Sequence, residues 1–318
     1  MKVGVIGCGS IGARYVQWLS ELGVEVAACD IELNNLNRVA DTATKTFSNI
    51  ERAMDWGVDK VVIATPPLHH LAPAITALGN NLDVLIEKPL TPSLQEADEL
   101  CAAATRSEGS AWVVCNMRFH PAIQSIADNM AELGTPLCVR AFFGHRLSQM
   151  RPAGTNVYAA STAEGGGVIL DCIHEFDVLQ WLLGPMQNIR GWCGQVGEDR
   201  IQADDVADMQ IEFANGCHGT VHFDFLSRLK RRGLEIIGND ATAVWGSVGK
   251  SPEACNVSLG TNQDCRVLLS SSDVDGFAPY KEMLRRFVGG GDGLQTINEA
   301  LRTLRFALAG SNSDWTAG

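Results

Sequence analysis

Short apolar runs alternate with amphipathic segments through the first 118 residues of the chain. In the amphipathic segments apolar side chains recur at helical spacing, whereas the runs have the length and character of buried strands. This alternation is typical of a doubly wound parallel sheet. The expected strands are Lys2–Ile6, Val24–Cys29, Lys45–Phe47, Lys60–Ala64, Leu82–Ile86 and Ala111–Asn116. One helix is expected to end at Gly23, and the others cover Asn34–Thr44, Ile50–Trp56, Leu71–Leu78 and Leu94–Thr105, the last capped by Ser93 and Glu96.

From residue 119 onward the order of elements changes. A helix and a strand are followed by the polar, irregular stretch Leu147–Ala163, a second helix that Gly165-Gly166-Gly167 opens, and a succession of strands. Asn215-Gly216 predicts a tight hairpin turn between two of these strands. The expected helices are His120–Leu133, Val168–Leu183, Pro279–Val288 and Leu294–Leu308. The expected strands are Leu137–His145, Ile189–Val196, Val206–Phe213, His218–Phe225, Gly233–Ile237, Ala241–Trp245 and Arg266–Leu269.

These patterns predict two domains, residues 1–118 with the parallel sheet and residues 119–318 with an α/β arrangement around a large, mostly antiparallel, open sheet. Helices are expected on one face of the second sheet. The other face must be covered or stay polar, and the run Val139–Phe143 is not polar throughout. We therefore expect the open face to pack against further copies of the chain, giving a homodimer or homotetramer.

A glycine pattern follows the first expected strand directly. Gly7-Cys8-Gly9-Ser10-Ile11-Gly12 is Gly-x-Gly-x-x-Gly between a strand and a helix, and the next strand ends at Asp30. In a Rossmann domain the first glycine permits the turn, the second lets a pyrophosphate approach, and the third lets helix and strand pack closely. The helix N-terminus supplies N–H groups to the phosphates. A carboxylate at Asp30 accepts hydrogen bonds from a ribose 2′-hydroxyl and repels a 2′-phosphate, so we expect NAD as cofactor, with NADP less suited.

Charge and composition exclude several classes of protein. The net charge of -12 and the pI near 5.0 argue against a nucleic-acid partner. Apolar runs are interrupted well before membrane-spanning length, and the chain begins with a strand rather than a signal peptide. Ten cysteines without a regular framework suggest buried, reduced thiols in a cytoplasmic protein. Histidine and cysteine do not occur at metal-ligand spacing, so no metal site is expected.

Two charged clusters are the candidates for the chemistry. Glu87-Lys88-Pro89 follows an apolar strand at the edge where doubly wound sheets bind their ligands. A proline at position 89 fixes the backbone after Lys88 and can be cis. The second cluster is Asp171, His174 and Asp177 in the helix Val168–Leu183, whose i, i+3 spacing predicts one shared face. Histidine is well suited to proton transfer near neutral pH.

Together with these clusters, Thr65-Pro66 with His69 and His70, Arg118-Phe119-His120-Pro121 and the three glycines at 165–167 give the chain a family resemblance. It resembles the glucose–fructose oxidoreductase, inositol dehydrogenase and MocA-like family of NAD(P)-dependent oxidoreductases over most of its length. The resemblance implies a Rossmann domain, a second α/β domain whose open sheet forms dimers or tetramers, and hydride transfer between nicotinamide and a secondary alcohol of a sugar or cyclitol.

The resemblance also implies roles for individual residues. Lys88 polarises or helps deprotonate the hydroxyl, His174 is the general base, and Asp171 or Asp177 orients it. Arg118 lies near the nicotinamide or the substrate. The expected cofactor-binding residues are Gly7, Gly9, Ser10, Ile11, Gly12, Asp30, Thr65, Pro66, His69, Glu87, Lys88, Asn116 and Arg118. The expected substrate-binding residues are Lys88, Arg118, Tyr158, Asp171, His174 and Asp177.

One departure from the family pattern concerns the helix. The commoner pattern is Asp-x-Gly-x-His-x-x-Asp, whereas Asp171 and His174 are one residue closer together here. The chain is similar to a branch with Asp-x-x-His-Glu-x-Asp that is found among enzymes of bacterial surface-sugar metabolism. The shorter spacing affects the expected role of Asp171 more than that of His174. The stretch Arg146–Ala163 is expected to cover the substrate.

Three functions are consistent with the sequence. The first is an NAD-dependent dehydrogenase acting on a secondary hydroxyl or keto group of a sugar, nucleotide sugar or cyclitol. The second is a reductase acting on a carbonyl or imine of a non-sugar substrate, with Lys88 and His174 as proton donors. The third is a regulatory protein that binds dinucleotide without turnover, although such proteins usually lose the lysine or the histidine. NADH formation with a polyol separates the third from the other two.

Overall fold

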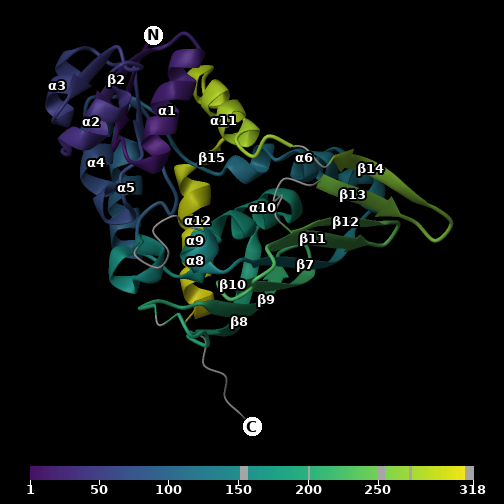
Figure 1. The fold of residues 1–318 in the computed structure, drawn as a ribbon. Helices are drawn as coiled ribbons and strands as arrows, with labels where there is room; N and C mark the ends of the chain where they lie inside the picture. The colour runs from purple at the N-terminus through teal and green to yellow at the C-terminus, as the bar shows by residue number, and fades with distance from the viewer. Residues whose placement is uncertain (151–156, 200, 250–254, 272–273, 312–318) are drawn as a thin grey trace. The chain divides into compact units, whose positions relative to one another are not determined.

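The computed structural model describes residues 1–150, 157–199, 201–249, 255–271 and 274–311 (Figure 1). The chain forms two compact units, each with its own sheet. The first comprises Met1–Cys115 and Tyr280–Arg302, and the second comprises Asn116–Pro279 and Thr303–Gly318. The sequence predicted two continuous domains, residues 1–118 and 119–318. The structure differs because Tyr280–Arg302 returns to the first unit.

The first unit is built on a seven-stranded sheet in the order β15-β6-β5-β4-β1-β2-β3. Its strands are parallel except β15, which pairs antiparallel with β6. The prediction of a doubly wound parallel sheet is confirmed. The strands are β1 (Lys2–Ile6), β2 (Glu25–Cys29), β3 (Lys45–Phe47), β4 (Lys60–Ile63), β5 (Asp83–Ile86), β6 (Ala111–Val113) and β15 (Gln295–Thr296).

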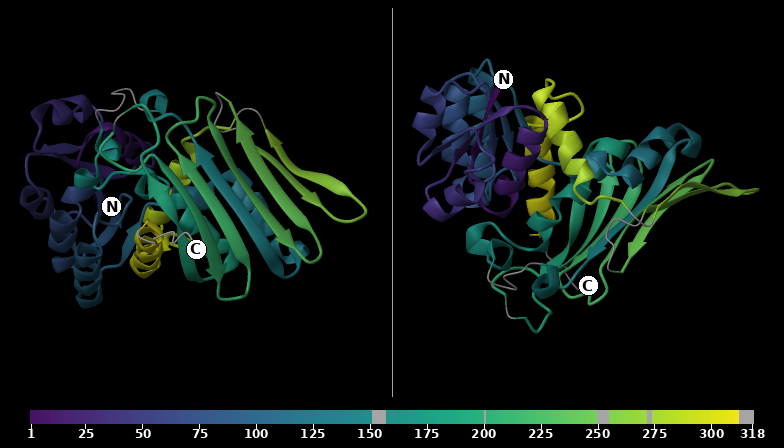
Figure 2. Two further views of the ribbon diagram at one scale, coloured as in Figure 1. Left: turned by 90° about the horizontal axis from the view of Figure 1, so that it is seen from below. Right: turned by 45° about the horizontal axis from the view of Figure 1, so that its top comes forward.

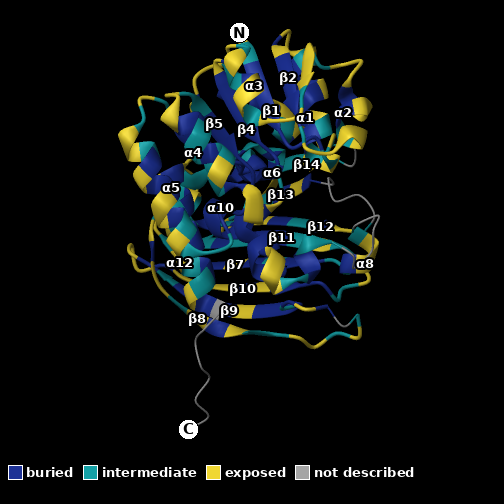
Figure 3. Ribbon diagram, turned by 90° about the vertical axis from the view of Figure 1, so that its left-hand side faces the viewer, coloured by how far each residue is buried: buried dark blue, intermediate teal, exposed yellow. Residues whose placement is uncertain are grey.

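Helices connect these strands and bury one side each, as the alternation of dark blue and yellow along them shows (Figure 3). α1 buries Tyr15, Val16 and Leu19. The Ser93 side chain accepts the Glu96 N–H at 3.3 Å and caps α5 as expected. The predicted helix 34–44 is too long, because α2 ends at Val39. The helices are α1 (Ser10–Glu21), α2 (Leu33–Val39), α3 (Ile50–Asp55), η1 (Pro67–His69), α4 (Leu71–Gly79), α5 (Leu94–Arg106) and α11 (Ala278–Val288).

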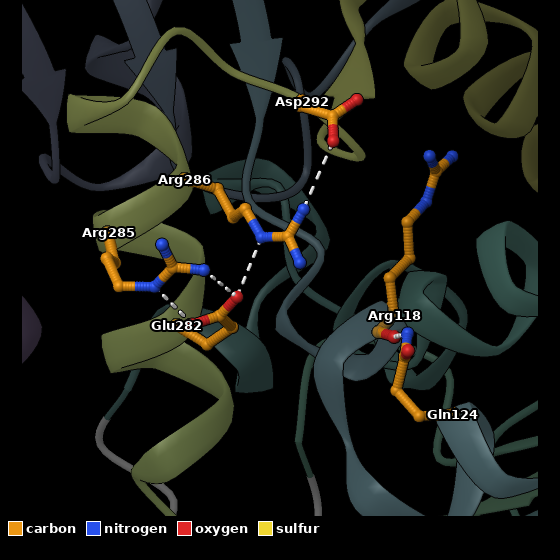
Figure 4. A network of polar contacts seen from close by, with 6 residues as sticks. All are labelled: Arg118, Gln124, Glu282, Arg285, Arg286 and Asp292. Carbon is orange, nitrogen blue, oxygen red and sulfur yellow. Dashed lines mark hydrogen bonds and ion pairs between the residues drawn. The ribbon is translucent and has the colours of Figure 1, made fainter.

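Aromatic packing explains why a late segment joins the first unit. On α11, Tyr280 lies against Trp18 with ring centroids 6.0 Å apart, and Phe287 meets Trp112 edge-on at 5.9 Å. The outer side of α11 carries Glu282, which binds Arg285 and Arg286 (Figure 4). These bonds, led by the one from Arg285, lower the pKa of Glu282 to about 2.

The second unit is built on an eight-stranded sheet in the order β14-β13-β12-β11-β7-β10-β9-β8 (Figure 2). All neighbours are antiparallel except β10 and β7, which are parallel, so the predicted mostly antiparallel sheet is confirmed. β13 is a strand that the sequence analysis missed. The strands are β7 (Pro136–Gly144), β8 (Met186–Gly194), β9 (Val206–Phe213), β10 (His218–Asp224), β11 (Arg231–Gly238), β12 (Thr242–Val248), β13 (Cys255–Gly260) and β14 (Cys265–Ser271).

The helices of the second unit correct three predictions. The long helix Val168–Leu183 is interrupted at Cys172, whose φ of -93° and ψ of 18° lie outside the helical region. The helix expected over 120–133 is interrupted at Asn129, and Asn116 begins a 3-10 helix instead of ending a strand. The helices are η2 (Asn116–Phe119), α6 (Pro121–Asp128), α7 (Met130–Leu133), α8 (Leu147–Met150), η3 (Tyr158–Ala160), η4 (Thr162–Glu164), α9 (Val168–Asp171) and α10 (Ile173–Leu183). α12 (Ile297–Ser311) begins in the first unit and continues in the second from Thr303.

The structure also bears on the expected burial of the cysteines, on membrane-spanning helices and on the loop expected to cover the substrate. Most cysteines are buried as expected, but Cys138 and Cys265, which lie near the starts of β7 and β14, are exposed. In the described part of the chain no helix combines the length and the apolar character needed to cross a membrane. Residues 151–156 of the loop that was expected to cover the substrate lie outside the described residues.

The glycine turn generates a test with an internal control. A Cβ at Gly12 would lie 1.8 Å from the Gly7 carbonyl oxygen, whereas a Cβ at Gly9 would meet no atom within 4 Å. We expect Gly12→Ala to force helix α1 away from β1 and to lower the melting temperature strongly or prevent folding. Gly9→Ala should fold with a melting temperature close to that of the unmodified chain. Thermal unfolding followed by circular dichroism checks both, and a stable Gly12→Ala protein would contradict this account.

Candidate active site

The glycine turn places helix α1 at the carboxyl end of β1. Gly7 has a φ of 89°, and its N–H donates to the Cys29 carbonyl at 2.8 Å. Helix α1 then begins at Ser10 with Gly9 as its N-cap. The N–H groups of the first turn of a helix have no partner inside the helix. The turn therefore presents N–H donors of the helix start to an anion. It is formed by Gly7, Gly9, Ser10, Ile11 and Gly12.

Asp30 follows β2 and lies against the same turn. Its Oδ2 accepts the Cys8 N–H at 2.6 Å and the Asn35 amide N–H at 3.1 Å. Its Oδ1 accepts the Glu32 N–H at 2.8 Å. These bonds fix the carboxylate beside the turn with a defined orientation. Asp30 therefore lies beside the glycine turn.

The loop after β4 carries the next group of predicted residues. Thr65 Oγ1 donates to the His69 carbonyl at 3.0 Å, and the exposed Pro66 begins the turn that leads into η1. His69 is exposed, but His70 is completely buried. The His70 ring lies 2.9 Å from the Thr65 carbonyl oxygen through Nε2 and 3.0 Å from the Pro89 carbonyl oxygen through Nδ1. The side chain therefore joins the loops after β4 and β5.

The loop after β5 carries Glu87 and Lys88. Glu87 is buried, and its carboxylate accepts hydrogen bonds from the Tyr15 hydroxyl and, at 3.1 Å, from the Lys88 backbone N–H. Burial, together with the charge of Glu87, raises the pKa of Tyr15 well above its usual value, so Tyr15 stays a neutral donor. Lys88 is half-buried, and the Lys88-Pro89 peptide bond is cis, as the sequence allowed.

These three loops lie at one edge of the first sheet. β5, β4 and β1 are consecutive parallel neighbours, so their carboxyl ends face the same way. The structure therefore brings together the predicted residues of the first unit: Gly7, Gly9, Ser10, Ile11, Gly12, Asp30, Thr65, Pro66, His69, Glu87 and Lys88. In a doubly wound sheet this edge is where dinucleotides bind.

In the second unit the structure pairs two residues that the sequence analysis treated as separate ligand-binding groups. The Arg118 guanidinium donates to both carboxylate oxygens of Asp177, from Nε at 2.8 Å and from Nη2 at 2.7 Å. Both side chains are at least 95% buried. The Gln124 amide donates to the Arg118 carbonyl (Figure 4). This ion pair ties η2 to helix α10.

His174 follows the helix break and is buried at the start of α10. It lines a cavity of the second unit together with Glu175, Arg232 and Trp245. Glu175 forms an ion pair with Arg232 of β11 at 2.6 Å. The Trp245 indole N–H has no hydrogen-bond partner among the described residues. Arg232 and Trp245 could not be identified from the sequence, since nothing in the spacing connects them to His174. Glu175 follows His174 directly, but its ion pair with Arg232 is visible only in the structure.

Asp171 is not on the same helix as His174. It ends α9, where its N–H donates to the Gly167 carbonyl at 3.0 Å, and the break at Cys172 separates it from α10. The predicted shared face of Asp171, His174 and Asp177 is therefore wrong for Asp171. Tyr158 lies in η3, close to the start of α9: a Cβ at Gly166 would lie 2.1 Å from the Tyr158 carbonyl oxygen. Gly166 permits this approach because it has no Cβ.

His120 adds a neutral ring to the second unit. Its Nδ1 accepts the Ala122 N–H at 3.3 Å, and its ring lies 5.0 Å from the Trp245 ring. Burial, with a smaller effect from Arg232, lowers the pKa of His120 to about 3. It therefore caps helix α6 in neutral form.

Two observations bear on cofactor and metal binding. Asn116 is buried, and its Oδ1 has no hydrogen-bond partner in the part of the chain that the structure describes. A buried amide oxygen without a partner is suited to an amide donor such as that of nicotinamide. The described residues contain no group of three His, Cys, Asp or Glu side chains placed to hold a metal ion.

Comparison with known proteins identifies relatives of both units. Residues 1–114 match the model of the oxidoreductase family with an NAD-binding Rossmann fold, GFO/IDH/MocA, and residues 126–244 match the C-terminal domain of the same family. The rhizopine catabolism protein MocA of Rhizobium meliloti is 30% identical over 190 residues, which are 58% of this chain and 57% of that protein. The chain thus spans somewhat more than half of that relative.

A second relative is matched over more of its length. The UDP-N-acetylglucosamine 3-dehydrogenase of Acidithiobacillus ferrooxidans is 30% identical over 252 residues, 76% of this chain and 73% of that protein. Among solved structures, the WlbA dehydrogenase of Bordetella pertussis in complex with NADH and UDP-GlcNAcA superposes with a TM-score of 0.81 at 20% identity, covering 98% of this chain and 96% of that one. This structural similarity supports the fold.

The buried ion pair of Arg118 and Asp177 leads to a prediction about the stability of the folded protein. Asp177→Asn removes the charge that balances a buried guanidinium, and we expect it to lower the free energy of unfolding by about 3–5 kcal/mol. Glu132→Gln, which breaks an ion pair with Arg266 that is about half exposed, is the control and should cost less than about 1 kcal/mol. Urea unfolding of both variants measures the difference in the free energy of unfolding. Equal small effects would show that Asp177 is not needed to balance the charge of the buried Arg118.

Proposed function

We propose that this chain, which belongs to the GFO/IDH/MocA family of oxidoreductases, transfers a hydride between NAD and a secondary hydroxyl or keto group of a sugar, nucleotide sugar or cyclitol. The observation that carries the proposal is the position of Lys88. It follows β5 at the edge where the glycine turn and the Thr65–His70 loop also lie, and Glu87 fixes its backbone. A lysine held at this edge points to chemistry on a ligand bound there.

The residues present fit a dinucleotide. The turn Gly7–Gly12 offers N–H donors and the open space at Gly9 to a pyrophosphate, and Asp30 offers a carboxylate to a ribose hydroxyl. Thr65, Pro66, His69 and Glu87 belong to the same edge. Asn116 supplies an amide oxygen that has no hydrogen-bond partner among the described residues. We assign Arg118 to a supporting role through Asp177. When bound, the nicotinamide accepts or returns the hydride.

Lys88 and His174 have different roles in the reaction of the substrate hydroxyl. The Lys88 ammonium stabilises negative charge that develops on the substrate oxygen, which is where a preorganised charge helps most. His174 accepts the hydroxyl proton as general base during oxidation and returns it during reduction. Asp171 and Tyr158 contribute to holding the substrate, since both lie in the segment of η3 and α9 that precedes His174.

Substitution of the two residues tests these roles. We expect His174→Asn to lower kcat by about a hundredfold to ten-thousandfold with an unchanged melting temperature, because positioned proton transfer is lost. Lys88→Met should cost at least as much, and the double variant should lose less than the product of both effects. The assay is NADH absorbance with NAD and scyllo-inositol, glucose 6-phosphate or UDP-N-acetylglucosamine.

Lys45→Met, at an exposed position of β3, is the control and should retain the kcat of the unmodified chain. A stable His174→Asn protein with nearly normal kcat would show that His174 is structural. If the unmodified chain binds NAD but turns over none of the three compounds or their keto forms, the proposal of a sugar or cyclitol dehydrogenase fails in favour of a non-catalytic or non-sugar function.

Asp30 predicts the choice of cofactor. Its carboxylate is fixed beside the glycine turn by three N–H donors, so it stays in the path of a 2′-phosphate. We expect kcat/KM to be higher with NAD than with NADP. The Asp30→Ser variant should have a smaller ratio of kcat/KM with NAD to kcat/KM with NADP. Steady-state kinetics with both cofactors give the ratio, and equal or higher kcat/KM with NADP would exclude this role of Asp30.

The open face of the second sheet predicts assembly with further copies of the chain. Helices cover one face, while the other exposes Trp192, Val244 and Val248, which are 41%, 44% and 57% exposed. Large apolar side chains on an uncovered sheet favour burial against another copy. Light scattering should show a dimer or tetramer at micromolar concentration, and Val244→Asp should weaken it. Leu22→Asp, at an exposed apolar position of the first unit, is the matched control. A monomeric unmodified chain would refute the assembly.

A further inference from the structure

The buried side chain of His70 contacts three carbonyl oxygens from two loops. Nε2 lies 2.9 Å from the Thr65 oxygen, and Nδ1 lies 3.0 Å from the Pro89 oxygen and 3.2 Å from the Leu90 oxygen. Thr65 belongs to the loop after β4, whereas Pro89 and Leu90 directly follow Lys88. One ring therefore spans the two loops at the carboxyl edge of the sheet.

A second contact fixes the same loop on the other side of Lys88. The Glu87 carboxylate accepts the Lys88 N–H and the hydroxyl of Tyr15, which lies on helix α1 next to the glycine turn. The residues before and after Lys88 are thus held by different elements, α1 through Glu87 and the loop after β4 through His70. Lys88 itself is half-buried between them.

We propose that His70 is a positioning residue, which acts on the reaction by holding the backbone after Lys88 and thereby fixing where the Lys88 ammonium lies. This inference rests on the catalytic role proposed for Lys88. His70 makes no contribution of its own to proton transfer in this account, because its ring nitrogens face backbone carbonyl oxygens. Its effect on turnover passes entirely through Lys88.

The acceptors explain why a histidine suits this position. Three carbonyl oxygens face the ring, and a buried carbonyl that loses its donor is left unsatisfied. A histidine ring has a nitrogen on each of two opposite sides, so it faces both loops at once. The neutral ring carries one N–H, which on Nδ1 donates to the carbonyl groups that follow Lys88. Burial is the largest effect and leaves the pKa of His70 below its usual value, although the bonds to Thr65, Leu90 and Pro89 raise it, so the ring is neutral near pH 7. Phenylalanine would fill a similar volume but donate to neither loop.

A double-mutant cycle tests the positioning role with the assay of the previous subsection. We expect His70→Phe to lower kcat by about tenfold to a hundredfold, the effect of a misplaced catalytic group. In a Lys88→Met background, the same substitution should change kcat by less than twofold. His70→Gln, which retains amide donors, should lose less than His70→Phe. Equal losses of kcat in both backgrounds would overturn the proposal.

Hydrogen exchange gives a readout that needs neither cofactor nor substrate. Peptides covering residues 86–92 should exchange faster in His70→Phe than in the unmodified chain, while the peptides of β1 and α1 keep their rates. Leu78→Ala, which removes a buried side chain of α4, is the stability control: it should lower the melting temperature without this local change. Unchanged exchange at 86–92 in His70→Phe would also overturn the proposal.

The two proposals fail in distinguishable ways. If Lys88→Met alone leaves kcat unchanged, the catalytic role of Lys88 is wrong, and the action of His70 through Lys88 is wrong with it. If Lys88→Met abolishes turnover and His70→Phe has the full kcat of the unmodified chain, the catalytic role stands and only the positioning role is refuted.

Discussion

Hydrogen bonding to the loop Glu87–Leu90 is the constraint on which the proposed chemistry depends. A lysine at the end of a strand is ordinarily a flexible surface group. Here Glu87 receives two hydrogen bonds before Lys88, and the carbonyl groups of Pro89 and Leu90 face His70 after it. Because Tyr15 and Thr65 belong to the segments that are expected to bind NAD, the contacts that fix Lys88 also connect it to the cofactor site.

The second unit uses buried ion pairs for a comparable purpose. Arg118 with Asp177 joins η2 to α10, and Glu175 with Arg232 joins α10 to the sheet. A buried pair gives little net stability compared with apolar residues of the same volume, but loss of one partner is costly. These pairs therefore fix the orientation of the first turns of α10, which carry His174. The bidentate geometry of Arg118 makes this orientation specific.

The sequence predicted the parallel sheet, the glycine turn and the loop residues of the first unit, because each depends on local spacing. The same spacing misled where backbone geometry overrides periodicity. The apolar pattern continues from Val168 to Leu183, yet the chain leaves the helical region at Cys172, and Asp171 is separated from His174. Ion pairs between distant positions could not be predicted either, since Arg118 and Asp177 are 59 residues apart in the sequence. The return of Tyr280–Arg302 to the first unit depends on aromatic packing that no local pattern indicates.

The most direct test of the central claim is to follow the hydrogen atom itself. The chain is incubated with NAD and scyllo-inositol, glucose 6-phosphate or UDP-N-acetylglucosamine carrying deuterium on the ring carbons, and the reduced cofactor is analysed by mass spectrometry and NMR. Direct hydride transfer predicts one deuterium at C4 of the nicotinamide, on one face only, and slower turnover than with the unlabelled compound. Reduced cofactor without deuterium would contradict the account.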